Sequence, residues 1–220
     1  MIWAKQKGGK EQQMYRKYVK RSIDIILSAV GLICLCWLFA IIAVTIKLDS
    51  KGPVMFKQKR LGLRGKEYNI YKFRSMCVGA EKLGVYSDNR DVRVTKIGKI
   101  LRATSLDELP QLVNVLVGDM SLIGPRPPLT YHPWPLEEYT NEQKRMFDVR
   151  PGLTGWAQIH GRKDVEWNKR IELNVWYVDH CSFFLDIRIF FVTIFKVILN
   201  ENNENKSATV KDNNRDLINK

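Results

Sequence analysis

The chain is poor in the residues that build disulfide frameworks and zinc sites. Its 220 residues include four cysteines and three histidines. The cysteines form no Cys-x-x-Cys pair, and two of them, Cys34 and Cys36, lie inside an apolar segment. The sequence therefore indicates neither a disulfide framework nor a zinc site. We expect the widely spaced histidines, His132, His160 and His180, to be ordinary surface or packing residues.

Acidic residues are also in deficit. The chain has 36 Lys and Arg residues against 23 Asp and Glu, which gives a formal net charge of +13. Such an excess implies an anionic partner, namely nucleic acid, acidic lipid headgroups or a phosphorylated substrate. No internal repeat is visible, and the length suffices for one domain with a full core.

The longest apolar run, Ile25 to Ile46, contains neither a charge nor a proline. As a helix it would be roughly 33 Å long, enough to cross a hydrocarbon core of about 30 Å. It is too long for a cleaved signal peptide. Basic residues flank both of its ends, and positive charge favours the cytoplasmic side of a membrane. A re-entrant helix over residues 22–48, which enters and leaves the same leaflet, satisfies both ends and is favoured over a simple span.

Three other regions are distinguished by composition. Residues 1–21 read as a polar, basic arm, and residues 200–220 are so poor in apolar side chains that we expect a disordered tail. Residues 183–199 are apolar but include Asp186, which makes a full crossing costly. A helix lying in the membrane interface fits this last region best. A buried terminal helix of a soluble core is the alternative.

The remaining pattern predicts an α+β fold. Residues 54–58 and 66–73 are expected to form two strands joined by a glycine-containing turn, that is, a small β-hairpin. Residues 78–94 are expected to be a loop. Helices are predicted over 96–102, 106–117, 140–147 and 166–179, the third beginning with a capping box at Thr140 and Gln143. We expect residues 49–199 to form a single, mainly helical domain.

An adjacent acid pair, Asp107-Glu108, has two interpretations. Ser105 and Glu108 match a Ser-x-x-Glu capping box, so Glu108 can simply close a helix N-terminus, where Asp107 would also suit the helix dipole. The same position suits chemistry, because an ionised Asp can attack phosphorus and an adjacent Glu can hold Mg²⁺. Pro110 distorts the first turn beside the acids. On these residues alone both interpretations stay open.

Cationic side chains elsewhere in the chain are suited to phosphate. Arg126 stands between two prolines, where its guanidinium is rigidly presented as a two-pronged donor. Lys72, Arg102 and Arg162 are weaker candidates, because a single basic residue among 36 is more often a solvated surface charge. The acids and cations together predict a site that handles phosphate and a metal ion.

Taken together, these motifs resemble those of the bacterial sugar transferases, the small monotopic phosphoglycosyl transferases. The resemblance runs from Lys20 to about Leu199. It rests on the order and spacing of five blocks, which are Gln58–Gly62, Tyr71–Met76, Ser105–Leu109, Gly118–Pro127 and Arg150–Arg162. The fold implied by the resemblance is a mixed helical domain with a small β-hairpin, a re-entrant N-terminal helix and interfacial helices.

The resemblance implies transfer of a sugar-1-phosphate from a UDP-sugar to polyprenyl (undecaprenyl) phosphate, with release of UMP. It implies that Asp107 is the nucleophile of a covalent phosphosugar intermediate and that Glu108 holds Mg²⁺ with it. Four residues are expected around the phosphates and two at the lipid headgroups: Arg126, Arg102, Lys72 and Arg162 for the former, and Lys20 and Arg21 for the latter.

The implied setting is the inner face of the cytoplasmic membrane, with the catalytic domain facing the cytoplasm. Such a reaction starts the assembly of a capsule, exopolysaccharide or other glycoconjugate, so downstream glycosyltransferases are expected partners and nucleic acid is not. Sugar specificity is expected in residues 78–90 and 129–138. The chain departs from the family at Cys36-Trp37, where a proline commonly breaks the membrane helix. Gly31 or Ser28 is expected to substitute for it.

Two other classes of protein remain as alternatives. A non-catalytic, membrane-tethered basic protein that binds nucleic acid or acidic lipid would explain the charge of +13 but not the acid pair. A membrane-bound phosphodiesterase would use the same Mg²⁺ site with water as the acceptor. Replacing Asp107 separates the first alternative from an enzyme, and the need for a lipid acceptor separates the second.

Overall fold

The N-terminal part of the chain is a long, bent helical segment. The computed structural model describes residues 9–80, 84, 91–161 and 166–199. Helices α1 (Lys10–Met14) and α2 (Lys20–Cys34) are joined by a π-helical stretch, Tyr15–Val19. Helix α3 (Cys36–Asp49) follows after a break at Leu35. Much of the expected basic arm is therefore helical and continues into α2.

The break lies where the missing proline was expected. Within the described residues no single helix has both the length and the apolar character needed to cross a bilayer. Lys10–Cys34 and Cys36–Asp49 meet those two criteria only when taken together, and they are bent by 60°. Gly31 lets α2 approach α5 closely, because a Cβ there would lie 3.3 Å from Leu112 Cδ1. The re-entrant topology over residues 22–48 stays a prediction.

The predicted β-hairpin is confirmed. Strand β1 (Met55–Leu61) pairs antiparallel with β2 (Glu67–Phe73), in the register that places Met55 opposite Phe73 and Leu61 opposite Glu67. The turn adopts positive φ at Arg64 (55°) and at Gly65 (68°). Directly opposed residues share a face of a hairpin, and residues two apart in a strand do so as well. Arg60 and Lys72 therefore lie on the same face.

The helical residues after the hairpin are broken more often than expected. Helix α4 (Lys96–Ala103) begins at Thr95, whose hydroxyl accepts a hydrogen bond from Gly98 N. The expected helix over 106–117 is instead a 3₁₀ turn, Leu106–Glu108, followed by helix α5 (Gln111–Val117). Ser105 has a φ of 58°, so the chain cannot run straight from α4 into the turn.

The second half of the chain surrounds a short parallel sheet. Strand β3 (Ser121–Ile123) pairs with β4 (Gly152–Thr154), and 3₁₀ turns lie at Leu136–Glu138 and Arg145–Asp148. The capping box at Thr140 and Gln143 is confirmed at the start of α6 (Asn141–Lys144). The last helices are α7 (Trp156–Ile159), α8 (Trp167–His180) and α9 (Phe183–Ile198), of which α8 matches its prediction closely.

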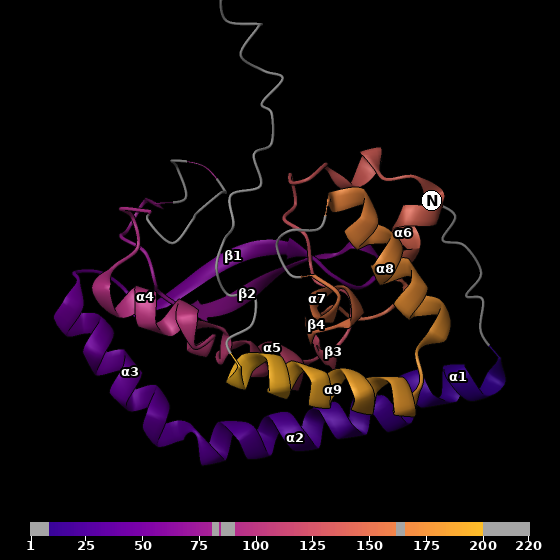
Figure 1. Ribbon diagram of the computed structural model, residues 1–220, viewed down its shortest axis with the longest axis horizontal. Helices are drawn as coiled ribbons and strands as arrows, with labels where there is room; N and C mark the ends of the chain where they lie inside the picture. The colour runs from indigo at the N-terminus through magenta and orange to yellow at the C-terminus, as the bar shows by residue number, and fades with distance from the viewer. Residues whose placement is uncertain (1–8, 81–83, 85–90, 162–165, 200–220) are drawn as a thin grey trace, which may run out of the picture.

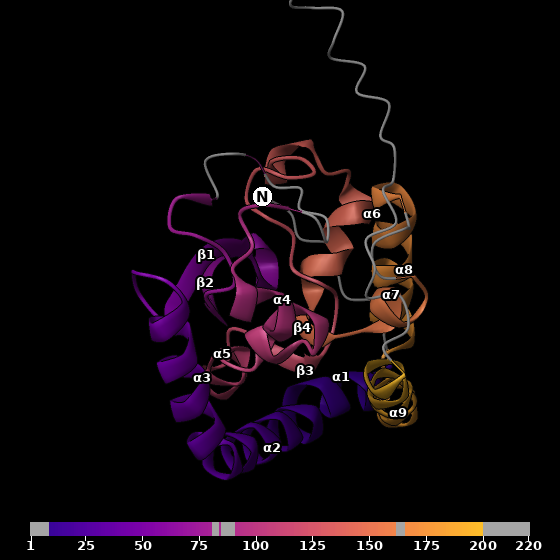
Figure 2. The ribbon, with the colours of Figure 1, turned by 60° about the vertical axis from the view of Figure 1, so that its left-hand side comes forward.

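Helix α9 lies beside the N-terminal helical segment, at the edge of the molecule formed by α2 (Figures 1 and 2). Its aromatic side chains are largely uncovered, with Phe184 81% exposed and Phe191 63% exposed. Only Asp186 and Ile189 of this helix are buried among its described side chains. The alternative of a buried terminal helix is therefore wrong, and the interfacial placement stays a prediction.

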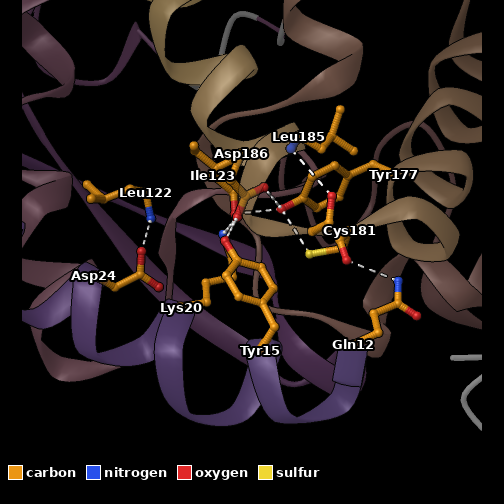
Figure 3. Close-up of polar contacts among 11 residues, drawn as sticks. Gln12, Tyr15, Lys20, Asp24, Leu122, Ile123, Tyr177, Cys181, Leu185 and Asp186 are labelled. Atoms are coloured by element: carbon orange, nitrogen blue, oxygen red, sulfur yellow. Dashed lines mark hydrogen bonds and ion pairs between the residues drawn. The ribbon is translucent and has the colours of Figure 1, made fainter. Parts of the chain in front are cut away.

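A buried polar cluster holds α9 against the N-terminal segment (Figure 3). The Asp186 carboxylate accepts hydrogen bonds from Tyr15 Oη at 2.7 Å, Tyr177 Oη at 2.7 Å and Lys20 Nζ at 2.5 Å. Gln12 Nε2 donates to the carbonyl of Cys181 at 3.2 Å. Burial and the Asp186 charge raise the pKa of both tyrosines, so they stay neutral donors.

Taken as a whole, the helices and the antiparallel hairpin confirm the predicted α+β fold.

Candidate active site

The acid pair lies in the tight turn between α4 and α5. Ser105 makes no capping hydrogen bond with its side chain, and the Glu108 side chain points to Lys72 instead. The capping-box interpretation is therefore wrong. Pro110, which lacks an N–H donor, is the N-cap of α5 and follows the pair after Leu109. Asp107 is 9% exposed, whereas the Glu108 side chain is 23% exposed.

Lys72 is held against Glu108 by the hairpin. Its Nζ lies 2.6 Å from Glu108 Oε1. The next two residues of the motif fix β2 to α3, because Phe73 packs edge-on against Phe39 and Arg74 donates to the carbonyls of Ser50 (2.7 Å) and Lys51 (3.0 Å). Residues 72–74, at the end of β2, thus connect the acid pair to the C-terminal end of α3.

Arg126 approaches the same carboxylate from a third part of the chain. Its Nη2 lies 3.8 Å from Glu108 Oε1, and its side chain is 40% exposed. The loop that carries it is fixed by backbone hydrogen bonds from Gly124 N to Thr154 O (2.8 Å) and from Gly152 N to Pro125 O (2.9 Å). The Gly-Pro motif at residues 124–125 and the Pro-Gly-Leu-Thr-Gly motif at residues 151–155 therefore pack backbone against backbone.

We expect Gly155→Ala to destabilise this contact strongly. A Cβ on Gly155 would lie 1.9 Å from the carbonyl oxygen of Gly124, and that atom belongs to the backbone and cannot rotate away. Overpacking of this kind costs about 2–3 kcal/mol, which lowers the melting temperature by roughly 5–10 °C in a chain of this size. Gly9→Ala, which meets no atom within 4 Å, should leave it unchanged. Equal melting temperatures for the two variants would contradict the contact.

A small, open cleft lies between the three segments. Glu108, Lys72 and Arg126 line it, together with two residues that sequence reasoning missed, Arg60 and Gln111. Asp107 lies next to Glu108 but is the more buried of the two acids and does not line the cleft. The alternation of the hairpin could have identified Arg60, since it shares a face with Lys72.

Arg60 fastens the hairpin to the Arg126 loop. Its Nη1 donates to the carbonyl of Pro127 at 3.1 Å, and its Nη2 donates to Gln58 Oε1 at 2.7 Å. Burial and the nearby Arg126 guanidinium lower the pKa of Arg60 to about 10, so it is still charged at neutral pH. The Glu108 carboxylate, 3.8 Å from Arg126, partly offsets the repulsion between the two guanidinium groups.

The two acids experience opposite electrostatic environments. Burial raises the pKa of Asp107, and the Glu108 charge adds to that effect, while Lys72 and Arg102 oppose it. Burial also acts to raise the pKa of Glu108, but Lys72 and Arg126 outweigh it and bring that pKa to about 2. Glu108 is thus a permanent anion at neutral pH, and Asp107 is the acid whose charge is costly.

The other predicted site residues are distributed differently. Arg102, on α4, is close enough to lower the pKa of Asp107. Arg162 lies outside the described residues. Lys20 is committed to Asp186, with its side chain 12% exposed, and Arg21 donates to the carbonyls of Val115 (2.6 Å) and Leu116 (2.9 Å) at the end of α5. Their expected contact with lipid headgroups stays a prediction.

The two segments expected to set sugar specificity, residues 78–90 and 129–138, lie only partly within the described residues. Most of residues 78–90 lies outside the described part of the chain. Within residues 129–138, Tyr131 is 58% exposed, whereas Trp134 packs against Tyr139 and His132 against Trp167. The three histidines are packing residues, as expected: His180 stacks on Trp176, His160 lies tilted against Trp156, and His132 packs edge-on against Trp167.

The acid pair supplies carboxylate ligands suited to Mg²⁺, at a site where substrate phosphates would complete the coordination shell. Among the described residues, no three His, Cys, Asp or Glu side chains gather as a complete metal cage. Mg²⁺ commonly binds through one or two carboxylates, with substrate phosphates and water completing its shell. Asp107 and Glu108 supply two such carboxylates, although Glu108 Oε1 is engaged by Lys72 here. The pair therefore fits Mg²⁺ that arrives with a phosphorylated ligand.

Comparison with known proteins identifies the family. The family model described as bacterial sugar transferase matches residues 15–200. An uncharacterized sugar transferase of Bacillus subtilis, EpsL, is 47% identical over 83% of this chain and 89% of its own length. A UDP-glucose:undecaprenyl-phosphate glucose-1-phosphate transferase of Escherichia coli is 40% identical over 84% of this chain and 41% of its own length.

A third relative is named for a different sugar. A UDP-N-acetylgalactosamine-undecaprenyl-phosphate N-acetylgalactosaminephosphotransferase of Aeromonas hydrophila is 40% identical over 82% of this chain. The chain spans 44% of that protein and 41% of the Escherichia coli one, but most of the Bacillus subtilis one. The match to nearly all of the described chain confirms the predicted resemblance. The chain belongs to the bacterial sugar transferase family, a family of transferase enzymes.

Proposed function

We propose that this protein transfers a sugar-1-phosphate from a UDP-sugar to undecaprenyl phosphate and releases UMP. The observation that carries the proposal is the meeting of Glu108, and beside it Asp107, with cations from separate chain segments, namely Lys72, Arg126 and Arg60. Relatives named for UDP-glucose and for UDP-N-acetylgalactosamine support the donor and acceptor classes.

The proposed mechanism has two displacement steps at one phosphorus atom. A carboxylate oxygen of Asp107 attacks the phosphorus that carries the sugar, the bond from that phosphorus to the oxygen of the UMP phosphate breaks, and UMP leaves. A phosphate oxygen of undecaprenyl phosphate then attacks the same phosphorus and releases Asp107. Charge balances in both steps without proton transfer. None of the described residues that line the cleft is a histidine, and the scheme needs none.

The cations of the cleft have separate roles in this scheme. Lys72 and Arg126 neutralise charge on the phosphoryl oxygens, where a preorganised donor has its largest effect. Arg60 keeps the Arg126 loop in place through Pro127. Mg²⁺, held by Asp107 and Glu108, would shield the phosphates when it is bound. Burial raises the pKa of Asp107, so the carboxylate is poorly solvated, a state that favours attack.

We place the reaction at the inner face of the cytoplasmic membrane. The bent α2–α3 pair and the exposed aromatic side chains of α9 support a monotopic attachment in which the catalytic part faces the cytoplasm. In this position the protein would begin the assembly of a capsule, exopolysaccharide or other glycoconjugate. Glycosyltransferases that extend the lipid-linked sugar would act next.

The proposal is tested by UMP release from the full chain in detergent with Mg²⁺. The substrates are UDP-glucose, UDP-galactose and their N-acetylhexosamine counterparts, each with and without undecaprenyl phosphate. We expect about one UMP per protein without the lipid and continuous turnover with it, for one sugar above the others. Release that strictly requires the lipid would contradict the covalent intermediate. Continuous release of sugar phosphate without lipid would favour the phosphodiesterase, and no release would favour the non-catalytic protein.

A further inference from the structure

Gln111 is a largely buried residue whose amide makes no hydrogen bond within the described part of the chain, although its polar atoms are not fully shielded from solvent. It is the first residue of α5, it is 3% exposed, and it lines the cleft together with Glu108 and Arg126. Asn114, one turn later and fully buried, provides the contrast, because its side-chain amide is hydrogen-bonded on both sides. Its Nδ2 donates to Asn69 O at 2.8 Å, and its Oδ1 accepts from Tyr71 N at 3.0 Å.

The Gln111 amide therefore meets the water of the cleft, and a ligand that displaces this water must replace its hydrogen bond or leave the amide unsatisfied. Packing of the fold alone does not require an amide here, because an apolar side chain of the same size would fill the same space. The amide faces a cleft, and a ligand in the cleft can supply the missing hydrogen bond. The position therefore indicates contact with a bound molecule.

The neighbours of Gln111 define the chemistry of that molecule. Lys72, Arg126 and Arg60 bring three positive charges to the cleft, and Glu108 brings one negative charge. An anion with several acceptor oxygens matches this set, as a phosphate or diphosphate does. The lysine and arginines supply charge, whereas an uncharged amide supplies a directional hydrogen bond with no further charge. This combination fixes the orientation of a phosphate as well as its position.

We propose that Gln111 contacts the diphosphate of the donor nucleotide and donates from Nε2 to a non-bridging phosphoryl oxygen. The inference rests on the proposed function, since it takes the donor to be a UDP-sugar. It assigns a substrate contact to a residue that is neither charged nor part of the acid pair.

The test uses UDP as the probe, because every UDP-sugar contains it. Binding of UDP to the full chain in detergent with Mg²⁺ is measured by calorimetry for wild type, Gln111→Met and Gln111→Glu. We expect Gln111→Met to bind about 10- to 100-fold more weakly, as for loss of one hydrogen bond to a charged group. Gln111→Glu should bind more weakly still, because it adds a negative charge beside the phosphate.

Gln12→Met is the matched control. Gln12 donates to carbonyls at the end of α8, including that of Asp179 at 2.9 Å, and it does not line the cleft. Its loss should lower the melting temperature and leave UDP affinity unchanged. Wild-type affinity in both Gln111 variants would overturn the inference, and so would failure of both to fold, which would show a structural role. Absence of UDP binding and of UMP release in the wild type would instead overturn the proposed function.

Discussion

Asp107→Asn is expected to lower UMP release by about 10⁴-fold or more, the scale seen when a nucleophile is removed. An amide of the same size fits the buried turn but cannot displace UMP from phosphorus. We also expect the intact mass of wild-type protein incubated with its UDP-sugar to rise by one sugar phosphate, and that of Asp107→Asn to stay unchanged. Rapid-quench UMP measurement and mass spectrometry check the two statements.

The fold of the variant provides the control for this result. Burial raises the pKa of Asp107, which means that its charge is unfavourable in the folded protein at neutral pH. Asp107→Asn removes that charge, so its melting temperature should equal or exceed that of the wild type. An inactive variant with a much lower melting temperature would point to a structural role for Asp107. Full activity in Asp107→Asn would exclude Asp107 as the nucleophile.

Lys72→Met is expected to lower UMP release by about 10²- to 10³-fold, the typical effect of losing one preorganised group that stabilises transition-state charge. The Lys72 ammonium lies 2.6 Å from Glu108 Oε1, and its side chain is only 16% exposed. Lys59→Met is the matched control on the same hairpin. Lys59 pairs with Glu67 at a side-chain exposure of 68%, so its loss should change neither activity nor stability measurably. Comparable losses for the two variants would refute a special role for Lys72.

The same variant is expected to change how stability depends on pH. In wild type the pKa of Glu108 is about 2, below its ordinary value of 4.5, so Glu108 contributes stability above about pH 4.5 and loses it as the pH falls toward 2. Without Lys72 the pKa of Glu108 rises, the contribution shrinks, and the remainder is lost at higher pH. Thermal unfolding between pH 3 and 7 in metal-free buffer measures this, and superimposable curves would contradict the ion pair.

Local signals made several elements predictable from the sequence. The alternation of residues 54–58 and 66–73 identified the hairpin, and Thr140 with Gln143 identified the start of α6 through a capping box that depends only on near neighbours. The acid pair and Arg126 stood out because rigid turns surround them. Arg126 and Glu108 do approach each other across the fold, at 3.8 Å, while their roles in catalysis stay predictions.

Features that depend on distant contacts were not predictable in the same way. The Ser-x-x-Glu pattern at Ser105 is a valid local signal, but Ser105 adopts positive φ and Lys72 captures Glu108, so tertiary contacts decide the outcome. Gln111 resembles any other helix residue in the sequence. Only the position of its side chain in a cleft, without a partner among the described residues, distinguishes it.

The Arg74 contacts impose a rule on any exchange of the N-terminal helices α1–α3 between relatives. Arg74 binds the two residues that follow α3, through the carbonyls of Ser50 and Lys51 and the Ser50 hydroxyl at 2.8 Å. A chimaera joined before Ser50 keeps Ser50 and Lys51 on the same parent chain as Arg74, so these contacts are retained next to Lys72, two residues away. A graft joined after Lys51 loses the hydroxyl contact wherever the other chain lacks Ser at this position, so the natural junction lies before Ser50.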